Sequence, residues 1–246
     1  LSFSDLQADS SSSITCDNRS KQAIPVENFI IEKDGCALCS RASSKRSLKA
    51  AKARIDSGEN KNSVREDTGW FVGADDRWRF EINDRDAALK TEALKKLRVA
   101  KHGSSYALST IMDHPKLYAA YPFLRQVRVF DTDFSEIGGS FDGESGHIQV
   151  NLDFSDANIL SFLMHEIQHA IQNYEGFASG TSGVTDSANY RRSAGEVEAR
   201  NVQSRISMTD AERRATPPSA TADVADSDVI VVFNGKEMAN APEPAN

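Results

Sequence analysis

The clearest hydrophobic pattern in the chain lies between residues 159 and 171. Its apolar positions recur at helical spacing: Ile159, Leu163, Ile167, Ala170 and Ile171. At about 100° per residue these positions form one wide apolar arc, which is typical of a helix that packs on a core. Ser155 or Asp156 can cap the start of this helix, and Gly176 can end it. The pattern therefore predicts a buried helix over this stretch.

Inside that helix the sequence places His165, Glu166 and His169, an HExxH motif. Residues four apart lie on one side of a helix, so both imidazoles project from the same strip. Glu166 instead falls within the apolar arc, where burying a carboxylate is unfavourable unless another group pairs with it. Two neutral nitrogen ligands, a position for water and a carboxylate base make up a zinc peptidase site. A chance pentapeptide on a solvated helix would leave Glu166 unexplained.

A catalytic zinc usually has three protein ligands and a water. The metzincin pattern, with a third histidine six residues after the second, is absent because position 175 is Glu175. The remaining histidines all lie upstream: His102, His114 and His147. A downstream carboxylate is therefore expected, as in the gluzincin arrangement. Residues 190–202 contain no proline and predict a second helix that can carry it.

Two carboxylates of that second helix compete for the ligand role. Helical phase places Glu198 near Ala194 and Val202, on the more apolar side. Glu196 has Arg200 at i+4, which a simple surface ion pair would also explain. Glu196 nevertheless begins an E-x-x-A-x pattern that resembles the ligand helix of several HExxH families. We favour Glu196, keep Glu198 as the alternative, and note that both would also suit a solvated helix.

Shorter patterns predict the rest of the domain. Residues 70–72 and 78–82 flank a turn and indicate a β-hairpin. Further elements are expected as follows: helices at 86–99, 106–112 and 117–120, strands at 126–130 and 147–152, and one edge strand at 228–233. Together these elements favour the α+β class. Residues 57–67 are polar and predict a linker.

The beginning and the end of the chain have a different character. Residues 1–30 are rich in serine, with one expected strand at 29–32, and residues 41–56 form a basic helical stretch. That stretch suits a solvated face, with a phosphate or nucleic-acid contact as the alternative. Cys36 and Cys39 form a CxxC pair without the further ligands of a structural zinc site. The expected organisation is a partly disordered segment 1–60, a domain 65–233 and a disordered tail 234–246.

Composition narrows the function classes. The chain has 246 residues, of which 39% are hydrophobic, so it can bury one core. A net charge of −7 argues against a global nucleic-acid surface. No run approaches the about 18 apolar residues of a membrane span, and no signal peptide is visible. Three cysteines, an odd number, favour a reducing compartment. Because the chain begins with Leu1, the missing signal is weak evidence.

Residues 162–218 resemble a metallopeptidase-like domain in the large polyvalent proteins of phages and conjugative elements, large polyvalent protein-associated domain 23 or a close relative. The matching stretches are residues 165–172 (HEIQHAIQ), 175–180, 194–203 and 212–218. Weaker likeness occurs at residues 68–70, 78–82, 114–117 and 120–122, so the resemblance covers roughly 65–233. It implies a zincin-like, gluzincin-type domain in which a small mixed sheet packs on the HExxH helix and a second ligand helix closes the site.

The expected chemistry is hydrolysis of a peptide bond in a protein or peptide substrate. Zn²⁺ lowers the pKa of a bound water toward about 7, and Glu166 takes its proton and passes it to the leaving amine. The oxyanion needs a further donor. Tyr190 is the first candidate, and the alternatives are Tyr174, Arg191 and Arg192. In zincins the strand before the metal helix commonly borders the cleft, so strand 147–152 is expected there, with His147 at its start.

The resemblance places such a protein in the cytoplasm of a bacterial host or inside a phage particle. No membrane association is expected, and a nucleic-acid partner is unlikely on charge grounds. Two other interpretations stay open: a zincin-fold module that binds a partner without cleaving it, and an effector directed at the host. Metal content together with peptide turnover would separate the peptidase from the binding module.

Overall fold

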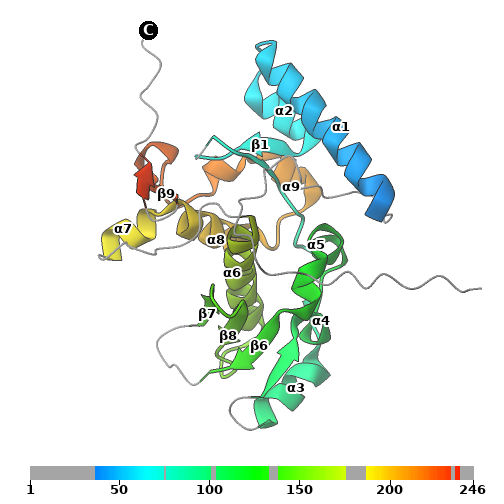
Figure 1. The fold of residues 1–246 in the computed structure, drawn as a ribbon, viewed down its shortest axis with the longest axis vertical. Coiled ribbons are helices and arrows are strands. Elements are labelled where there is room, and N and C mark those ends of the chain that lie inside the picture. Colours follow the sequence, from blue (N-terminus) through cyan, green and yellow to red (C-terminus); the bar gives the residue numbers. More distant parts are fainter. Residues whose placement is uncertain are drawn as a thin grey trace, which may run out of the picture.

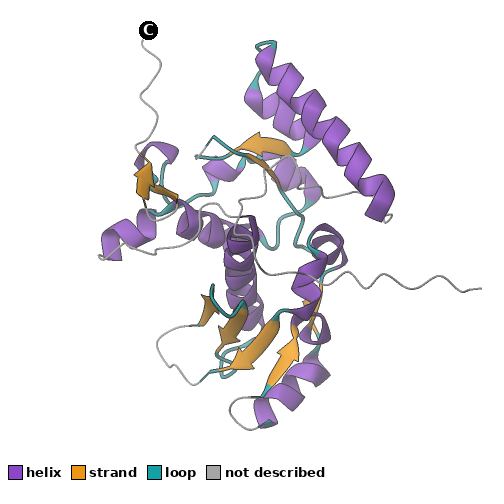
Figure 2. Cartoon of the chain, viewed as in Figure 1, coloured by secondary structure: helices purple, strands orange, loops and turns teal. Residues whose placement is uncertain are grey.

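The structure is a computed structural model that describes residues 37–74, 76–100, 104–132, 138–175, 187–233 and 236–238. It is an α+β fold with several helices and small sheets, which confirms the predicted class (Figure 2). The Ser-rich start, the expected strand at 29–32 and Cys36 lie outside the described residues. Nothing is described of the side chain of Cys39, so the CxxC pair is not tested.

The first elements form a helical hairpin beside a β-hairpin at one end of the molecule (Figure 1). They are α1 (Ala37–Asp56), α2 (Lys61–Thr68), β1 (Trp70–Val72) and β2 (Trp78–Phe80). The two strands pair antiparallel, with Trp70 opposite Phe80, as the sequence predicted. The expected second strand ended at residue 82, whereas β2 ends at Phe80.

The polar stretch 57–67, expected to be a linker, is largely the helix α2, so that prediction was wrong. Asn60 caps this helix, because its side chain accepts hydrogen bonds from the backbone amides of Asn62 and Ser63. Val64 is fully buried in a small core that includes Leu48, Ala51 and Trp70. Buried Arg65 of the same helix donates to the carbonyl of Arg213 at 2.8 Å. The cap and these tertiary contacts order a helix that is otherwise polar.

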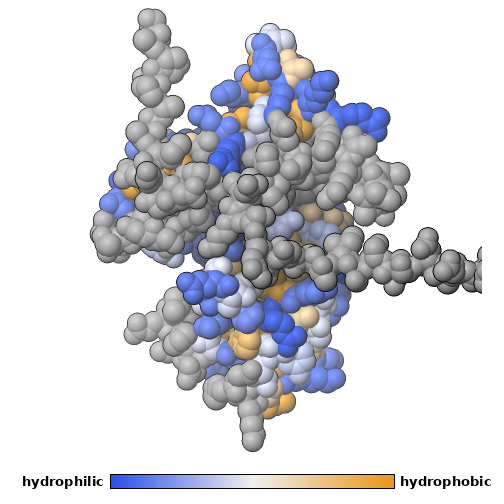
Figure 3. Space-filling view, in the orientation of Figure 1, coloured by the Kyte–Doolittle hydropathy of each residue, from blue (hydrophilic) through white to orange (hydrophobic). Residues whose placement is uncertain are grey.

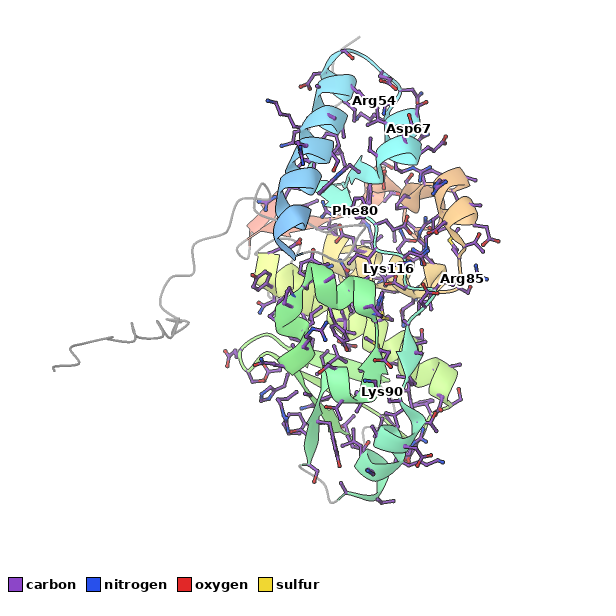
Figure 4. The ribbon with its side chains drawn as sticks, turned by 90° about the vertical axis from the view of Figure 1, so that its right-hand side faces the viewer. Arg54, Asp67, Phe80, Arg85, Lys90 and Lys116 are labelled. Carbon is purple, nitrogen blue, oxygen red and sulfur yellow. The ribbon has the colours of Figure 1, made fainter. Side chains whose placement is uncertain are left out.

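An exposed ion-pair group also links the two helices. Arg54 of α1 lies 2.7 Å from Asp67 of α2 and also pairs with Glu59 in the connecting turn. Figure 4 shows Arg54 and Asp67 facing each other at the end of the hairpin. Such exposed pairs contribute little stability, so the buried Val64 and Trp70 hold the hairpin together.

A four-stranded mixed sheet lies at the other end of the molecule (Figure 1). Its strands, in spatial order, are β4 (Ser105–Ala107), β6 (Arg128–Asp131), β8 (His147–Val150) and β7 (Gly139–Asp142). β6 and β8 run parallel, and the two outer pairings are antiparallel. The sequence predicted β6 and β8 but gave no signal for β7, because Gly139 and Ser140 have low strand propensity.

β8 is an inner strand without a free edge for a substrate, which corrects the expectation that strand 147–152 offers its edge. It pairs with β6 on one side and β7 on the other. Among the described strands, β7 is therefore the edge of the sheet on this side.

Four short helical elements lie between β2 and β6, the first of them before β4 and the other three after it. They are α3 (Thr91–Val99), α4 (Leu108–Ile111), α5 (Pro115–Ala120) and the 3₁₀ helix η2 (Pro122–Gln126). The expected helices 86–99 and 106–112 were too long. β3 (Ala88–Leu89) pairs with β5 (Met112–Asp113). The start of the first predicted helix and the end of the second are therefore strands. Tertiary pairing overrides helix propensity at both places.

Two long helices join the ends of the molecule. α6 (Asp156–Glu175) packs on β7 and β8, and α8 (Ala194–Arg205) packs on α6. The expected helix 190–202 is divided, because α7 (Ser187–Arg192) ends where Ser193 forms a bridge with Ile230. The buried face of α6 belongs to the main core.

The chain after α8 folds back beside it. Its elements are α9 (Asp210–Ala215), η3 (Pro218–Ala220), η4 (Asp226–Asp228), β9 (Val231–Phe233) and β10 (Lys236–Met238). Val229 and Val231 pack on Ala194 and Val197 of α8. β10 lies within the stretch 234–246 that we expected to be a disordered tail, and it pairs antiparallel with β9.

Figure 3 shows one face of the molecule, on which hydrophilic and hydrophobic residues are interspersed. Hydrophilic residues predominate on the outer side of the α1–α2 hairpin (Figure 3). Within the described residues, no helix has the length and apolarity needed to cross a membrane.

Candidate metal centre

α6 presents the HExxH motif at the edge of the core. Its first turn is held by Arg98, which pairs with Asp156 at 3.0 Å, and its buried face carries Ile159 and Leu163. The side chains of His165 and His169 are 16% and 13% exposed, so they lie at the margin of that face. The predicted helix and the predicted position of the histidines both agree with this arrangement.

α8 brings Glu196 to the two histidines. Oε1 of Glu196 lies 3.2 Å from Nε2 of His169, and Oε2 lies 3.5 Å from Nε2 of His165. The ligating atoms of these three residues all lie within 4.8 Å of one another. Glu196 is in the first turn of α8, where a carboxylate is favoured by the helix dipole.

The start of α8 is fixed by the C-terminal segment. The backbone amide of Ala194 donates to the carbonyl of Ile230 at 2.9 Å, and the amide of Ile230 donates to the carbonyl of Arg192. The bridge at Ser193 thus sets where α8 begins and which residue faces α6. The position of Glu196 therefore depends on backbone contacts far away in the sequence.

Two glutamines determine which ring nitrogen of each histidine carries the proton and which is left as an acceptor. Nε2 of Gln203 donates to the carbonyl of Ser161, which turns Oε1 of Gln203 toward Nδ1 of His165 at 3.1 Å. Nε2 of Gln172 donates to the carbonyl of Gly195, which turns Oε1 of Gln172 toward Nδ1 of His169 at 2.9 Å. Each Nδ1 must then donate its proton, because an amide oxygen can only accept.

The consequence is a cluster of three acceptors. When Nδ1 carries the proton of a neutral imidazole, Nε2 presents a lone pair. The two Nε2 atoms lie 3.1 Å apart, and the carboxylate of Glu196 faces both. Three lone-pair donors at such distances repel one another unless a cation lies among them. The side chains therefore fit a metal ion of the type that takes two imidazoles and a carboxylate.

The titration behaviour agrees with a site that attracts positive charge. Burial alone would lower the pKa of His169, but the Glu196 carboxylate beside it favours the protonated ring and raises that pKa. Burial would raise the pKa of Glu196, but the rings of His165 and His169, when protonated, favour the carboxylate and lower its pKa well below its usual range. A carboxylate that stays ionised next to an imidazole is suited to a cation.

Glu166 lies beside the cluster without belonging to it. It is buried, and burial raises its pKa, although the neighbouring histidines act in the opposite direction. The backbone amide of Phe141 in β7 donates to its carboxylate. The carboxylate of Glu166 therefore lies against β7. The predicted separation of Glu166 from the two ligands agrees with this geometry.

Glu198, the alternative third ligand, points elsewhere. Its Oε1 lies 2.5 Å from Nη2 of Arg79, and its Oε2 accepts from Nε2 of Gln172 at 3.3 Å. It does not join the group formed by His165, His169 and Glu196. The geometry thus favours Glu196 over Glu198.

Of the expected oxyanion donors, only Tyr190 approaches the cluster through a described contact. Its hydroxyl hydrogen-bonds to Glu196, and burial and this carboxylate raise the pKa of Tyr190, so it remains a donor. The others are engaged away from the site: Tyr174 stacks on Phe123, Arg191 faces Asp223, and Arg192 donates to the carbonyl of Asp228.

The remaining histidines do not join the centre in the described part of the chain. His147 packs its ring against Phe130 in the sheet. His114 is buried and hydrogen-bonds Asp84 at 2.8 Å. His102 lies outside the described residues.

Sequence reasoning missed the supporting residues. Gln172 follows His169 by three positions on one helix, a spacing that could have indicated contact. Gln203 and Gly139 carry no such signal, because only the packing of α8 and β7 on α6 brings them near.

Part of the chain matches the model of a known family. Residues 37–90 match the family model of large polyvalent protein associated domain 23. The resemblance to that family is confirmed, but the match overlaps the expected range 65–233 only at residues 65–90. Of the stretches that suggested it, residues 68–70 and 78–82 lie inside the match, whereas the HExxH helix lies outside. No curated protein and no solved structure matches the chain.

Proposed function

We propose that this protein is a zinc-dependent peptidase that uses Glu166 as its general base. The observation that carries the proposal is the convergence of His165 Nε2, His169 Nε2 and the Glu196 carboxylate within 4.8 Å, beside a buried glutamate. Two imidazoles and a carboxylate are a common ligand set for catalytic zinc. The fold would then be a zincin-like one of the gluzincin type, with α6 as the metal helix and α8 as the second ligand helix.

His165, His169 and Glu196 would hold the ion. A bound zinc supplies Lewis-acid polarisation of the substrate carbonyl and makes water more acidic. The protein's own contribution is to fix the three ligand atoms within 4.8 Å of one another.

Glu166 accepts the proton of the attacking water and later delivers it to the leaving amine. Its burial favours the protonated form, which suits a group that must hold a proton during part of the cycle. The Phe141 amide keeps the carboxylate oriented while it is ionised. General-base catalysis of this kind contributes roughly 10²–10⁴-fold.

Tyr190 turns its hydroxyl proton from Glu196 to the developing oxyanion. Burial and the Glu196 carboxylate raise its pKa, which keeps the proton in place. A donor aimed at the oxyanion position accounts for roughly 10²–10³-fold in turnover where such donors have been removed.

The substrate is a protein or peptide in extended form. Among the described strands β7 is the edge strand next to Glu166, and such an edge pairs with a peptide backbone without demanding a particular sequence. Gly139 fits this role because a Cβ there would lie 3.1 Å from Cγ of Glu166. The peptide would pass Gly139 and present its scissile bond to Glu166.

The family match supports a biological setting. A domain associated with large polyvalent proteins over residues 37–90 suggests a product of a phage or mobile element. The cytoplasm of a bacterial host or the phage particle would then be the site of action.

Peptide turnover tests the proposal. The parent and Glu166→Gln are compared on a mixed peptide library, with zinc content measured on the same samples. We expect Glu166→Gln to keep the fold and the zinc and to lose hydrolysis by at least about 10²-fold. Equal cleavage by both proteins would assign the activity to a contaminant or another site. A zinc-loaded parent that cleaves no peptide would favour a binding module of the same fold.

A further inference from the structure

The segment that matches the family model contacts α8 through two ion pairs at the end of β2. Arg79 in β2 pairs with Glu198 of α8 at 2.5 Å. Glu81, two residues later, pairs with Arg205 of α8 at 2.7 Å and also with Arg213 of α9. Both ion pairs join the β2 region to α8. Beyond α8, however, the partners of Glu198 differ from those of Arg205.

From Arg79 a chain of hydrogen bonds reaches a proposed metal ligand. Glu198 uses one carboxylate oxygen for Nη2 of Arg79 and the other for Nε2 of Gln172, at 3.3 Å. The amide oxygen of Gln172 then accepts from Nδ1 of His169 at 2.9 Å. Arg79 and Glu198 are 11% and 22% exposed, and Gln172 is fully buried, so water screens this chain weakly.

The direction of each bond matters for the metal centre. A carboxylate held by Arg79 presents an acceptor to the Gln172 amide group, which keeps the amide oxygen toward His169. That oxygen holds the imidazole in the tautomer whose Nε2 is free. Gln172 also donates to the carbonyl of Gly195 at 3.0 Å. The orientation of the Gln172 amide therefore depends on Gly195 as well as on Arg79.

We propose that Arg79, through Glu198 and Gln172, is a positioning residue that sets the orientation of His169, so that the segment matching the family model is a working part of the metal centre. The inference rests on the proposed zinc site. It assigns Glu198 a role as the intermediate between Arg79 and Gln172. It also explains why a segment far from the HExxH motif in sequence is folded against α8.

Zinc affinity in a chelator competition is the measurement, made on the full chain. Arg79→Met keeps the alkyl length and removes the charge, and Glu198→Gln keeps the volume. Each should weaken zinc binding about 10-fold, the lower end of the effect of losing an outer-shell partner. Arg79→Lys, which keeps the charge, should recover part of the loss.

Glu81→Gln is the matched control. It breaks the neighbouring ion pair between the β2 region and α8 but has no described contact with Gln172. It should lower the melting temperature at least as much as Arg79→Met while leaving zinc affinity unchanged. If Glu81→Gln weakens zinc binding as much as Arg79→Met, the effect comes from general destabilisation and the inference is wrong.

A double variant tests the path itself. In a Gln172→Met background, Arg79→Met should have no further effect on zinc affinity, because the link to His169 is already cut. An undiminished effect would show that Arg79 acts by another route. A parent that binds zinc and cleaves peptides, with Arg79→Met unchanged in affinity, overturns only this inference. A parent that binds no zinc overturns the proposed function as well.

Discussion

Oε1 of Glu196 lies 3.2 Å from Nε2 of His169, a contact that joins the first turn of α8 to the middle of α6. Two residues along α8, Glu198 faces Arg79 instead. A rotation of about 200° separates positions i and i+2 on a helix, so the two carboxylates serve opposite surroundings. Glu196 completes the acceptor cluster, and Glu198 contacts Gln172, which orients His169.

Replacement of these two glutamates should therefore have unequal effects. Glu196→Ala removes a ligand and should weaken zinc binding by more than about 100-fold, whereas Glu198→Ala removes an outer partner and should cost about 100-fold at most. The comparison is made by chelator competition at fixed pH. The opposite order would move the ligand role to Glu198.

Gln203 should orient His165 as Gln172 orients His169. Gln203→Leu keeps the approximate size but removes the acceptor for Nδ1 of His165, so zinc affinity should fall by about 10-fold or more. Ser204→Ala is a suitable control, because Ser204 is exposed and bonds only within its own helix in the contacts described. Equal affinities for the parent and Gln203→Leu would remove Gln203 from the centre.

Gly139 should be sensitive to a single added methyl group. A Cβ at this position would lie 3.1 Å from Cγ of Glu166 and 3.1 Å from the carbonyl of Gln149. Gly139→Ala should displace the carboxylate slightly and lower kcat/KM by roughly 10-fold, since even a displacement of about 1 Å costs about 10²-fold. Zinc content should remain unchanged.

Gly143→Ala provides the comparison for that variant. Its added Cβ would lie no closer than 3.6 Å to the side chain of Asn173, which is an ordinary contact. Its activity should equal that of the parent. If both alanine variants lose activity together, the loss reflects a general change in β7 and the turn after it rather than contact with Glu166.

The sequence was sufficient for the parts that depend on local pattern. The apolar spacing of Ile159, Leu163 and Ile167 predicted α6, and the i, i+4 spacing placed both histidines on one strip. It also predicted that Glu166 would be buried, because it falls within the same arc. These are properties of one helix, so no knowledge of the rest of the chain was needed.

The choice between Glu196 and Glu198 could not be made in this way. It depends on the register of α8, which the backbone bridge between Ser193 and Ile230 fixes. β7 was missed for a related reason, because Gly139 and Ser140 form a strand only by pairing with β8. Contacts between distant segments decide both cases, and a single sequence does not display them.

Glu81 should be important for stability rather than for metal binding. It neutralises two arginines, Arg205 and Arg213, whose side chains are 3% and 7% exposed. Glu81→Gln leaves both charges without this partner and should lower the free energy of unfolding by about 3 kcal/mol, measured by chemical denaturation. Glu59→Gln, which breaks an exposed pair with Arg54, should change stability little. Similar small losses in both variants would contradict this role.

The most direct test of the account is the zinc content of the purified chain, measured by elemental analysis after reconstitution and removal of free metal. We expect about one zinc per molecule in the parent and in Glu166→Gln, as for a site with three protein ligands. The double variant His165→Ala, His169→Ala should retain none. A folded parent without zinc, or a double variant that holds as much zinc as the parent, would contradict the assignment of His165, His169 and Glu196 as the metal centre.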